Sequence, residues 1–335
     1  MNKLITLIAF LCSLSLLNAQ NLLNQPESIV YDTSYSRYLV SNCGDGMIVQ
    51  IDDAGVQSYF NTDLSYTLGL HIANDMVFVS TNDGPYAGIN GIFLSTGLIG
   101  FHVDIPEKVL LNDITSDLDG NLYVTDCDAN KIFKVDISDT SYTTLVSSGL
   151  GYPNGILYDS ANNSLLVLNC MLSGRPILSV SLDDLSISTR VETGIFAIDG
   201  LTEDQQGNYY FSSWNTDCVY RYDHSFTHPP ETIAEDFNDP ADIFYNKINN
   251  TLAIPNFSAD TIIFMPISLV NLEEPGADEE GSLHVYPNPF SDRLMLKFNQ
   301  NLYSSLELRI YNLEGKLISS PERIENSHGD NTFAW

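Results

Sequence analysis

Six positions recur at nearly constant spacing through the first three quarters of the chain, and four of them carry side-chain oxygens. The interval is 42 to 45 residues, and each position lies five residues before an Asp or Asn that begins a tight turn. Carboxylate and amide oxygens are the ligands that hard divalent cations, calcium above all, prefer. The pattern predicts a cation site built from Glu27, Asn112, Asn154 and Asp199, with Gly69 and Ala241 at the other two positions.

A cation held by these four side chains would leave room for water or a substrate oxygen. It would polarise an ester, lactone or phosphoryl oxygen, while Asp199 or Glu27 activates water or attacks directly. His71 lies two residues after Gly69, so on a strand it would point to the same side and is a candidate proton shuttle. The set contains no Cys or His, which disfavours zinc or copper. The alternative interpretation is that these residues only cap strand ends or hydrate a channel.

The elements that must position these residues are short strands with the same repeat. Six apolar segments end in small or polar residues, at 38–42, 77–81, 122–126, 165–169, 209–213 and 252–256. A third strand-like segment follows in most copies, as at 47–52, 131–136 and 218–223. Four short strands per repeat of this length are typical of a β-propeller blade. We therefore predict an all-β protein whose residues 20–267 form a six-bladed β-propeller, with the repeated positions meeting at one mouth of its central channel.

The net charge and the N-terminal segment indicate which partners are disfavoured and where the protein is located. The 335 residues include 43 acidic and 14 basic side chains, a net charge of −29, which disfavours nucleic acid and anionic membranes as partners. Residues 1–19 combine Lys3 with an apolar run and a small-residue end, the pattern of a signal peptide. We expect an exported monomer with no transmembrane segment in the mature chain.

Four cysteines remain after the signal peptide, and none forms a Cys-x-x-Cys pair. Cys43, Cys127 and Cys170 each follow the second strand of a blade, where blade 5 has Trp214, so we expect them at one level on the cation face. Cys218 lies elsewhere in its repeat. Free, partly buried thiols are favoured, and a disulfide between Cys127 and Cys170 is the alternative because their blades are adjacent.

The C-terminal part has a different character. Residues 268–281 are acidic and rich in Pro and Gly, as in a linker, and residues 282–335 contain Tyr-Pro-Asn-Pro-Phe at 286–290 and Tyr-Asn-Leu-Glu-Gly-Lys at 311–316. Both motifs resemble those of the C-terminal sorting domain of the type IX secretion system. The resemblance implies a small β-sandwich that the secretion machinery reads, and a protein secreted or displayed at the cell surface by way of the periplasm. The family normally continues beyond the position of Trp335, so we expect an incomplete domain.

The propeller segment also resembles a known family. Residues 27–32, 112–113, 153–156 and 199–201 are similar to the blade starts of the senescence marker protein/gluconolactonase family, whose wider superfamily hydrolyses lactones, aryl esters or phosphotriesters with a divalent cation, usually calcium. The resemblance implies that Glu27, Asn154 and Asp199 are ligands and that Asn112 is a ligand or a substrate contact. Leu110 stands where the lactonase branch often has Arg, with Lys108 two residues before it, which argues against sugar-acid recognition.

Two functions from different classes follow from these observations. The first is an exported calcium-dependent hydrolase of the lactonase or arylesterase type, acting on a small ester or lactone. The second is a non-catalytic propeller that binds glycans or proteins, with an ion that only ties the blades together. No serine-hydrolase elbow, zincin motif or phosphate-binding glycine loop is present. Residues 117–120 resemble the start of a calcium loop, but its twelfth position is Asp128 instead of Glu, so we expect a hairpin turn.

Overall fold

The computed structural model describes residues 20–267 and five strands of the C-terminal part. The signal peptide predicted at 1–19 and the linker predicted at 268–281 lie outside the described residues. The chain divides into two compact units, Met1–Ser268 and Leu269–Trp335. Among the described residues there is no helix with the length and apolarity needed to cross a membrane.

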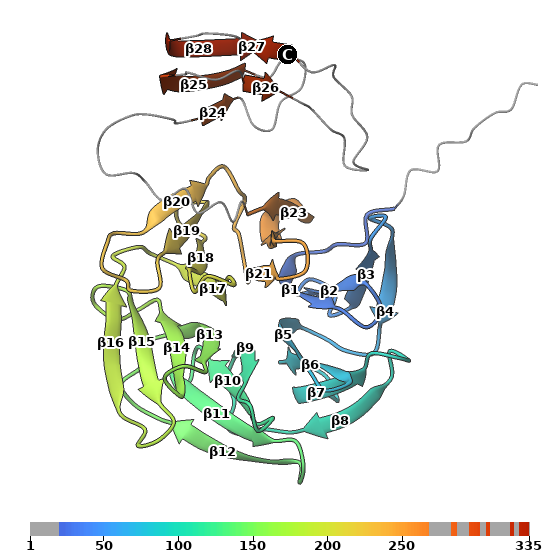
Figure 1. The fold of residues 1–335 in the computed structure, drawn as a ribbon. Helices are drawn as coiled ribbons and strands as arrows, with labels where there is room; N and C mark the ends of the chain where they lie inside the picture. Colours follow the sequence, from blue (N-terminus) through green and yellow to red (C-terminus); the bar gives the residue numbers. More distant parts are fainter. Residues whose placement is uncertain are drawn as a thin grey trace, which may run out of the picture. The chain divides into compact units, whose positions relative to one another are not determined.

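Six antiparallel sheets of the first unit form a ring, here called blades 1 to 6 (Figure 1). Strands follow each other in sequence order, with the first innermost, which confirms the six-bladed propeller. The blades are, in order, β1 (Pro26–Asp32), β2 (Arg37–Asn42), β3 (Ile48–Asp52), β4 (Gln57–Asn61); β5 (Thr67–Ala73), β6 (Met76–Thr81), β7 (Gly88–Phe93), β8 (Ile99–Val103); β9 (Leu111–Ser116), β10 (Leu122–Asp126), β11 (Lys131–Asp136), β12 (Ser141–Val146); β13 (Pro153–Asp159), β14 (Ser164–Asn169), β15 (Pro176–Ser181), β16 (Ile187–Glu192); β17 (Ile198–Glu203), β18 (Tyr209–Ser213), β19 (Cys218–Tyr222), β20 (Glu231–Ala234); β21 (Phe244–Asn246), β22 (Thr251–Asn256) and β23 (Thr261–Pro266).

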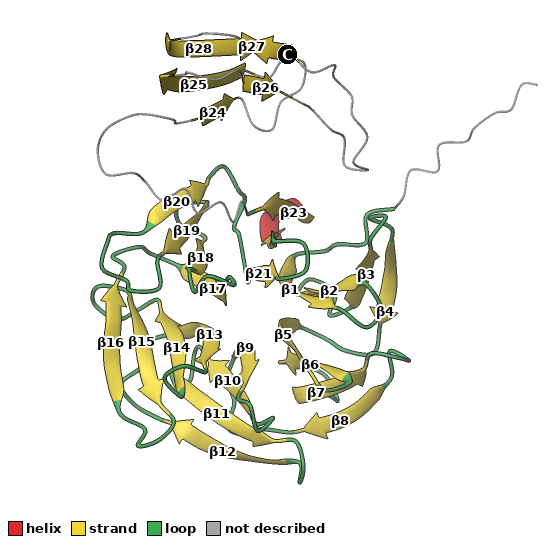
Figure 2. Ribbon diagram, in the orientation of Figure 1, coloured by secondary structure: helices red, strands yellow, loops and turns green. Residues whose placement is uncertain are grey.

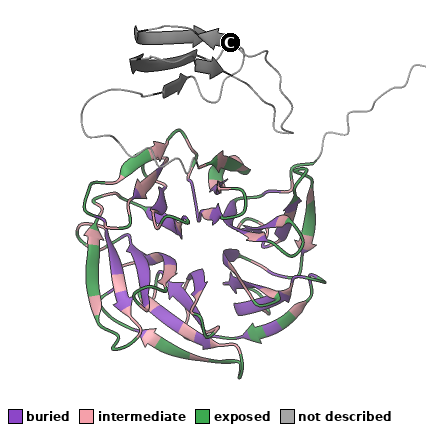
Figure 3. Cartoon of the chain, in the orientation of Figure 1, coloured by how far each residue is buried: buried purple, intermediate pink, exposed green. Residues whose placement is uncertain are grey.

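The six apolar segments of the repeat are the second strands, β2, β6, β10, β14, β18 and β22, as predicted. They are buried on both faces because each blade packs between two neighbours, and Leu39, Val124 and Phe211 are fully enclosed. The outer strands, such as β12 and β16, are largely exposed (Figure 3). The apolar core is therefore divided into clusters between and within blades, and the centre of the ring is left to the inner strands.

The predicted turns at the ends of the inner strands are confirmed. The side-chain oxygen of Asp32, Asp159 or Asn246 accepts a hydrogen bond from the backbone N–H two residues later, at 3.0 Å in each case. At Asp117 the same oxygen accepts from the N–H groups of Asp119 and Asn121, so this segment is a hairpin turn and not a calcium loop. These turns set the length of each inner strand.

Blade 6 differs from the others because it has three strands within the described residues, where four were predicted. A three-residue 3-10 turn, Phe257–Ala259, is the one helical element of the described residues (Figure 2). The N-terminal segment closes the ring beside this blade, since Asn21 Nδ2 donates to Asp260 O (2.8 Å) and Asp242 N donates to Glu27 O (2.9 Å). Closure brings the start of β1 against the start of blade 6.

The second unit contains two small antiparallel sheets. One has the order β24 (Leu283–Tyr286), β25 (Met295–Asn301) and β28 (His328–Ala334), and the other pairs β26 (Leu306–Leu308) with β27 (Glu322–Ile324). Strand β24 ends at the first residue of the Tyr-Pro-Asn-Pro-Phe motif, and β25 begins five residues after the motif.

Candidate metal centre

Each inner strand carries one extra residue near its start. In blade 1 the pairing passes from Pro26↔Asn42 to Ile29↔Val40, so Glu27 and Ser28 lie opposite the single residue Ser41. Such a bulge breaks the alternation of side chains and changes where they point. It occurs at the same place in every blade, at 27–28, 68–69, 112–113, 154–155, 199–200 and, beyond the Pro240↔Asn256 bridge, at 241–243.

The bulges define the ring of equivalent positions, and one predicted member is wrong. The first bulge residue is Glu27 in blade 1, and in blade 2 it is Leu68, not Gly69. The cause is the turn after Ala73, which has two residues and is shorter than the turns of the other blades. Counting five residues back from Asn74 therefore reaches the residue after the true ring position. The corrected ring is Glu27, Leu68, Asn112, Asn154, Asp199 and Ala241.

Serine and threonine hydroxyls lock the bulges of adjacent blades together. Thr125, opposite the bulge of blade 3, accepts from Asp113 N (3.1 Å) and donates to Asn154 O in blade 4 (2.9 Å). Ser212 does the same between Gly200 N (2.9 Å) and the ring carbonyl of blade 6 (2.7 Å). The backbone of the ring is thus fixed by hydrogen bonds that do not use the ring side chains.

Three of the four predicted ligand side chains have a buried oxygen with no hydrogen-bonding partner among the described residues. Glu27 and Asp199 are each 4% exposed and Asn112 is 8% exposed. Six buried side-chain polar atoms of the described region have no partner, and three of them are Glu27 Oε2, Asn112 Oδ1 and Asn154 Oδ1. Buried polar atoms are paired in the great majority of cases, so three unpaired acceptors in one ring need an explanation.

The carboxylates of the ring lie close enough to repel each other. Burial raises the pKa of Glu27 well above its ordinary value, and the charges of Asp199 and Asp113 raise it further. Burial likewise raises the pKa of Asp199 to about 7, against the opposing effect of the nearby Trp214 and Asn154 side chains. Burial and mutual repulsion thus favour the protonated forms of these groups when no cation balances their charge.

Sequence reasoning missed two further buried carboxylates. Asp113 and Asp242 follow the ring positions of blades 3 and 6 and are 4% and 7% exposed. Both are hydrogen-bonded, unlike Glu27 Oε2: Asp113 accepts from Ile114 N and Ile156 N, each at 2.7 Å, and Asp242 accepts from Ser28 Oγ at 2.5 Å. They therefore join adjacent blades. Strict strand alternation would turn them away from the ring residues, which is why the repeat gave no signal for them.

The donor set consists of two carboxylates and two amides. Among the described residues no group of three or more His, Cys, Asp or Glu side chains is arranged to hold a metal ion, so a site here must use the oxygens of Asn112 and Asn154 as well. Calcium accepts amide and carboxylate oxygens together, whereas zinc and copper favour nitrogen and sulfur. The residues present fit a hard divalent cation by their chemistry.

His71 is held between two blades. Its Nε2 atom lies 2.8 Å from Ser116 Oγ on the inner strand of blade 3. In the corrected register His71 lies three residues after the ring residue Leu68, so it is equivalent to Thr115 in blade 3. Thr115 Oγ1 accepts a hydrogen bond from Tyr158 N across the next blade junction (3.2 Å). Burial lowers the pKa of His71 to about 4, so its imidazole is neutral at neutral pH. Its role as a proton shuttle stays a prediction.

The loop residues after the second strands lie on the ring face, as expected. Cys127 Sγ donates to Pro153 O and Cys170 Sγ to Ile198 O, each at 2.8 Å, so these thiols touch the residues just before Asn154 and Asp199. The four cysteines of residues 20–267 are all free. Burial raises the pKa of Cys43 and of Cys170 to about 12, which makes them poor nucleophiles.

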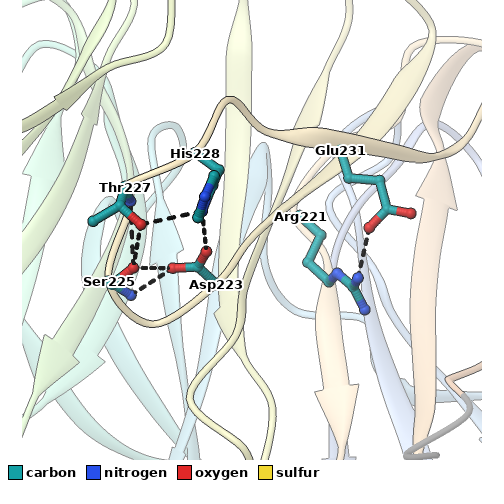
Figure 4. Close-up of polar contacts among 6 residues, drawn as sticks. All are labelled: Arg221, Asp223, Ser225, Thr227, His228 and Glu231. Carbon is teal, nitrogen blue, oxygen red and sulfur yellow. Dashed lines mark hydrogen bonds and ion pairs between the residues drawn. The ribbon is translucent and has the colours of Figure 1, made fainter. Parts of the chain in front are cut away.

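A surface group in blade 5 resembles a catalytic triad in its residue types only. Figure 4 shows Ser225 Oγ donating to Asp223, whose other oxygen lies 3.3 Å from His228 Nδ1. A triad needs the serine on the second imidazole nitrogen, so that His can take its proton. Here serine and histidine bind the same carboxylate, and the His228 side chain is 80% exposed. This group is a polar turn that caps the end of β19.

Comparisons with known proteins support the two-part organisation. Residues 284–333 match the family of the secretion system C-terminal sorting domain. No curated protein sequence matches the chain. Among solved structures, a gluconolactonase from Xanthomonas campestris aligns with a TM-score of 0.63 and 14% identity over 73% of this chain and 87% of its own.

Two structures from Bacteroides thetaiotaomicron are also similar. One is a protein of unknown function, with a TM-score of 0.62 and 13% identity over 72% of this chain and 68% of its own. The other is an auxiliary nutrient binding protein, with a TM-score of 0.57 and 13% identity over 71% of this chain and 68% of its own. Identities this low show the fold alone. The chain is therefore a secreted or cell-surface protein in which a six-bladed propeller, similar in fold to a gluconolactonase, precedes a type IX secretion system C-terminal sorting domain.

Proposed function

We propose that the propeller is a divalent-cation-dependent hydrolase of the lactonase or arylesterase type, with calcium bound by Glu27, Asn112, Asn154 and Asp199. The observation that carries this proposal is the set of three buried, unpaired oxygens on Glu27, Asn112 and Asn154, beside the Asp199 carboxylate. Each of these oxygens has lost its contact with water and gained no hydrogen bond, a cost that a bound cation would offset.

The charges of the ring support the same assignment. The ionised carboxylates of Glu27 and Asp199 repel each other, and a divalent cation between them would neutralise both charges. When bound, such an ion supplies Lewis-acid polarisation of an ester or lactone carbonyl. The hydroxyl bridges of Thr125 and Ser212 would keep the ring backbone fixed during the reaction, because they bind its carbonyls from outside.

The protein's own groups would move the proton. The Trp214 and Asn154 side chains beside Asp199 lower its pKa, and once ionised its carboxylate could accept a proton from water or attack the carbonyl. Trp214 lies beside it with a buried, unpaired Nε1–H, a donor suited to an oxygen of a substrate or of Asp199. Neutral His71, deeper in the blade junction, would relay protons through Ser116.

The test is hydrolysis of a panel of lactones, aryl esters and phosphotriesters by the purified protein. We expect turnover of at least one class, its loss on chelation by EGTA and its return with calcium. Asp199→Asn should lower kcat by at least ~100-fold, since it removes the proton acceptor but keeps the shape of the side chain. Unchanged turnover in Asp199→Asn would remove Asp199 from the mechanism.

The second candidate is a non-catalytic binding propeller, favoured by the apolar ring member Leu68 and by Leu110 beside the ring. A binding protein is among the structures of similar fold. In this case calcium would bind and stabilise the protein, but no member of the ester and lactone panel would turn over. A glycan array probed with the calcium-loaded protein would then identify the ligand class.

A further inference from the structure

The unpaired polar atoms extend beyond the ring to the loop between β14 and β15. Besides the three ring oxygens, the buried atoms without a partner are Asn42 Oδ1, Trp214 Nε1 and Arg175 Nε. Arg175 ends the loop that begins at Cys170, whose thiol touches the residue before Asp199. Its positive charge lowers the pKa of Cys170 against the larger effects of burial and Asp199. The Arg175 guanidinium thus belongs to the same ring-end loop as Cys170.

Hydrogen bonds between two loops fix the backbone at Arg175, and contacts with Phe196 and Leu172 orient its guanidinium. Thr193 Oγ1 donates to Arg175 O (2.7 Å), and Gly194 N donates to Gly174 O (2.8 Å). The Arg175 guanidinium carbon lies 4.3 Å from the centre of the Phe196 ring, and Nη1 donates to Leu172 O (2.6 Å). Stacking and one hydrogen bond orient the planar group but leave most of its donors free.

Arg175 has no ion-pair partner among the described residues, although the loops around it are acidic. The loops at the ring end of the propeller contain two basic residues, Arg175 and Lys108, among many Asp and Glu. In the described part of the chain, Arg37, Arg221 and His228 form ion pairs with carboxylates, whereas Arg175 pairs with none. An oriented arginine with free donors is suited to bind a carboxylate through two parallel hydrogen bonds.

Two exposed apolar side chains lie on the loops beside Arg175. Phe196, on which the guanidinium stacks, is 54% exposed, and Met171, in the same loop as Arg175, is 70% exposed. Exposed apolar side chains beside a charged group suit a ligand with an apolar body and one charged end. The ring below would then reach a second, uncharged carbonyl of the same molecule.

We propose that Arg175 binds the free carboxylate of the substrate, so that the site takes esters or lactones of aromatic or other apolar acids that carry such a group. This inference rests on the proposed function, because the carboxylate belongs to the molecule that the ring would hydrolyse. It is testable without turnover, since a carboxylate that lacks an ester should bind the same residue.

The first experiment is titration calorimetry of benzoate into the calcium-loaded protein. Arg175→Gln should weaken benzoate binding ~10-fold or more, as expected for the loss of a charge-assisted hydrogen-bond pair. Arg190→Gln is the matched control. Arg190 lies on the outer strand β16, and its guanidinium carbon is 5.0 Å from the centre of the Phe226 ring. It should bind benzoate as the unaltered protein does. Equal affinity in Arg175→Gln, or no benzoate binding at all, would overturn the proposal.

Two further measurements separate this inference from the hydrolase proposal. If 4-acetoxybenzoate and its methyl ester are hydrolysed, Arg175→Gln should raise KM for the first and leave both kinetic constants of the second unchanged. If neither is hydrolysed while benzoate still binds through Arg175, the carboxylate site stands and the catalytic proposal fails. Thermal melting of Arg175→Gln checks that it is folded, and Arg175→Lys, which keeps the charge without the planar fork, should bind benzoate with intermediate affinity.

Discussion

The two pairs of buried carboxylates at the centre of the propeller differ in what surrounds them. Asp113 and Asp242 are bound by backbone or hydroxyl donors, whereas Glu27 Oε2 has no hydrogen-bonding partner among the described residues and Asp199 has only the Trp214 and Asn154 side chains beside it. All four are at most 7% exposed, so burial does not distinguish them. The comparison teaches that the first pair stabilises the ring and the second is available to a ligand.

The largest effect on folding should come from the satisfied pair. Asp113→Ala leaves two buried N–H groups, of Ile114 and Ile156, without acceptors, and each unpaired group costs ~1–3 kcal/mol. We expect the free energy of unfolding in urea to fall by roughly 2–4 kcal/mol. Asp113→Asn retains one acceptor oxygen and should lose about half as much. A fall in Glu27→Ala as large as that in Asp113→Ala would erase the distinction between the pairs.

One carboxylate of each pair should also make stability depend on pH. The pKa values of Asp113 and Asp199 are raised to about 7 by burial, above their ordinary value of 3.8. The folded protein therefore binds these protons more tightly than the unfolded chain, and the metal-free protein should lose stability as the pH rises from about 4 to about 7. Melting temperatures measured in EGTA across this range check the prediction.

Glu27→Gln sharpens the same measurement, since it removes a buried charge that faces Asp199 and Asp113. It should melt at a higher temperature than the unaltered protein at pH 8 in EGTA and gain nothing from calcium. Calcium should stabilise the unaltered protein more at pH 8 than at pH 5, because protons compete with the cation for the same oxygens. Equal stabilisation at both pH values would count against a carboxylate site.

A smaller effect is expected where a hydroxyl fixes the ring from outside. Thr125→Val removes the bridge from Asp113 N to Asn154 O and should cost ~1–2 kcal/mol of unfolding free energy. Calcium affinity should fall less than in any ring variant, because Asn154 keeps its side chain. A complete loss of calcium binding in Thr125→Val would show that the backbone position, more than the side-chain oxygens, determines the site.

The sequence predicted the level of the ring because one repeat places equivalent residues at equivalent heights. It failed at Gly69, where a two-residue turn after β5 moved the counting point, and the true ring residue is Leu68. Asp113 and Asp242 were missed for a different reason. A bulge adds a residue without a distinctive composition, so two neighbouring side chains, such as Asn112 and Asp113, reach the centre where alternation allows one.

The mouth was predicted less completely than the ring. The level of Cys127 and Cys170 followed from their position after the second strand, and their free thiols are seen in the structure. Arg175 gave no signal, because its place depends on hydrogen bonds between two loops of different blades. Loop pairing of this kind has no period in the sequence, so only the folded chain reveals which side chains lie in the ring-end loops beside Cys170 and Phe196.

Calcium titration by calorimetry, on the unaltered protein and on Glu27→Gln, Asp199→Asn and Asp242→Asn, tests the central claim most directly. The account predicts one calcium ion bound per propeller, binding lost in the first two variants and retained within ~10-fold in Asp242→Asn, whose carboxylate is occupied by Ser28. Absence of calcium binding in the folded, unaltered protein, or equal loss in all three variants, would contradict it.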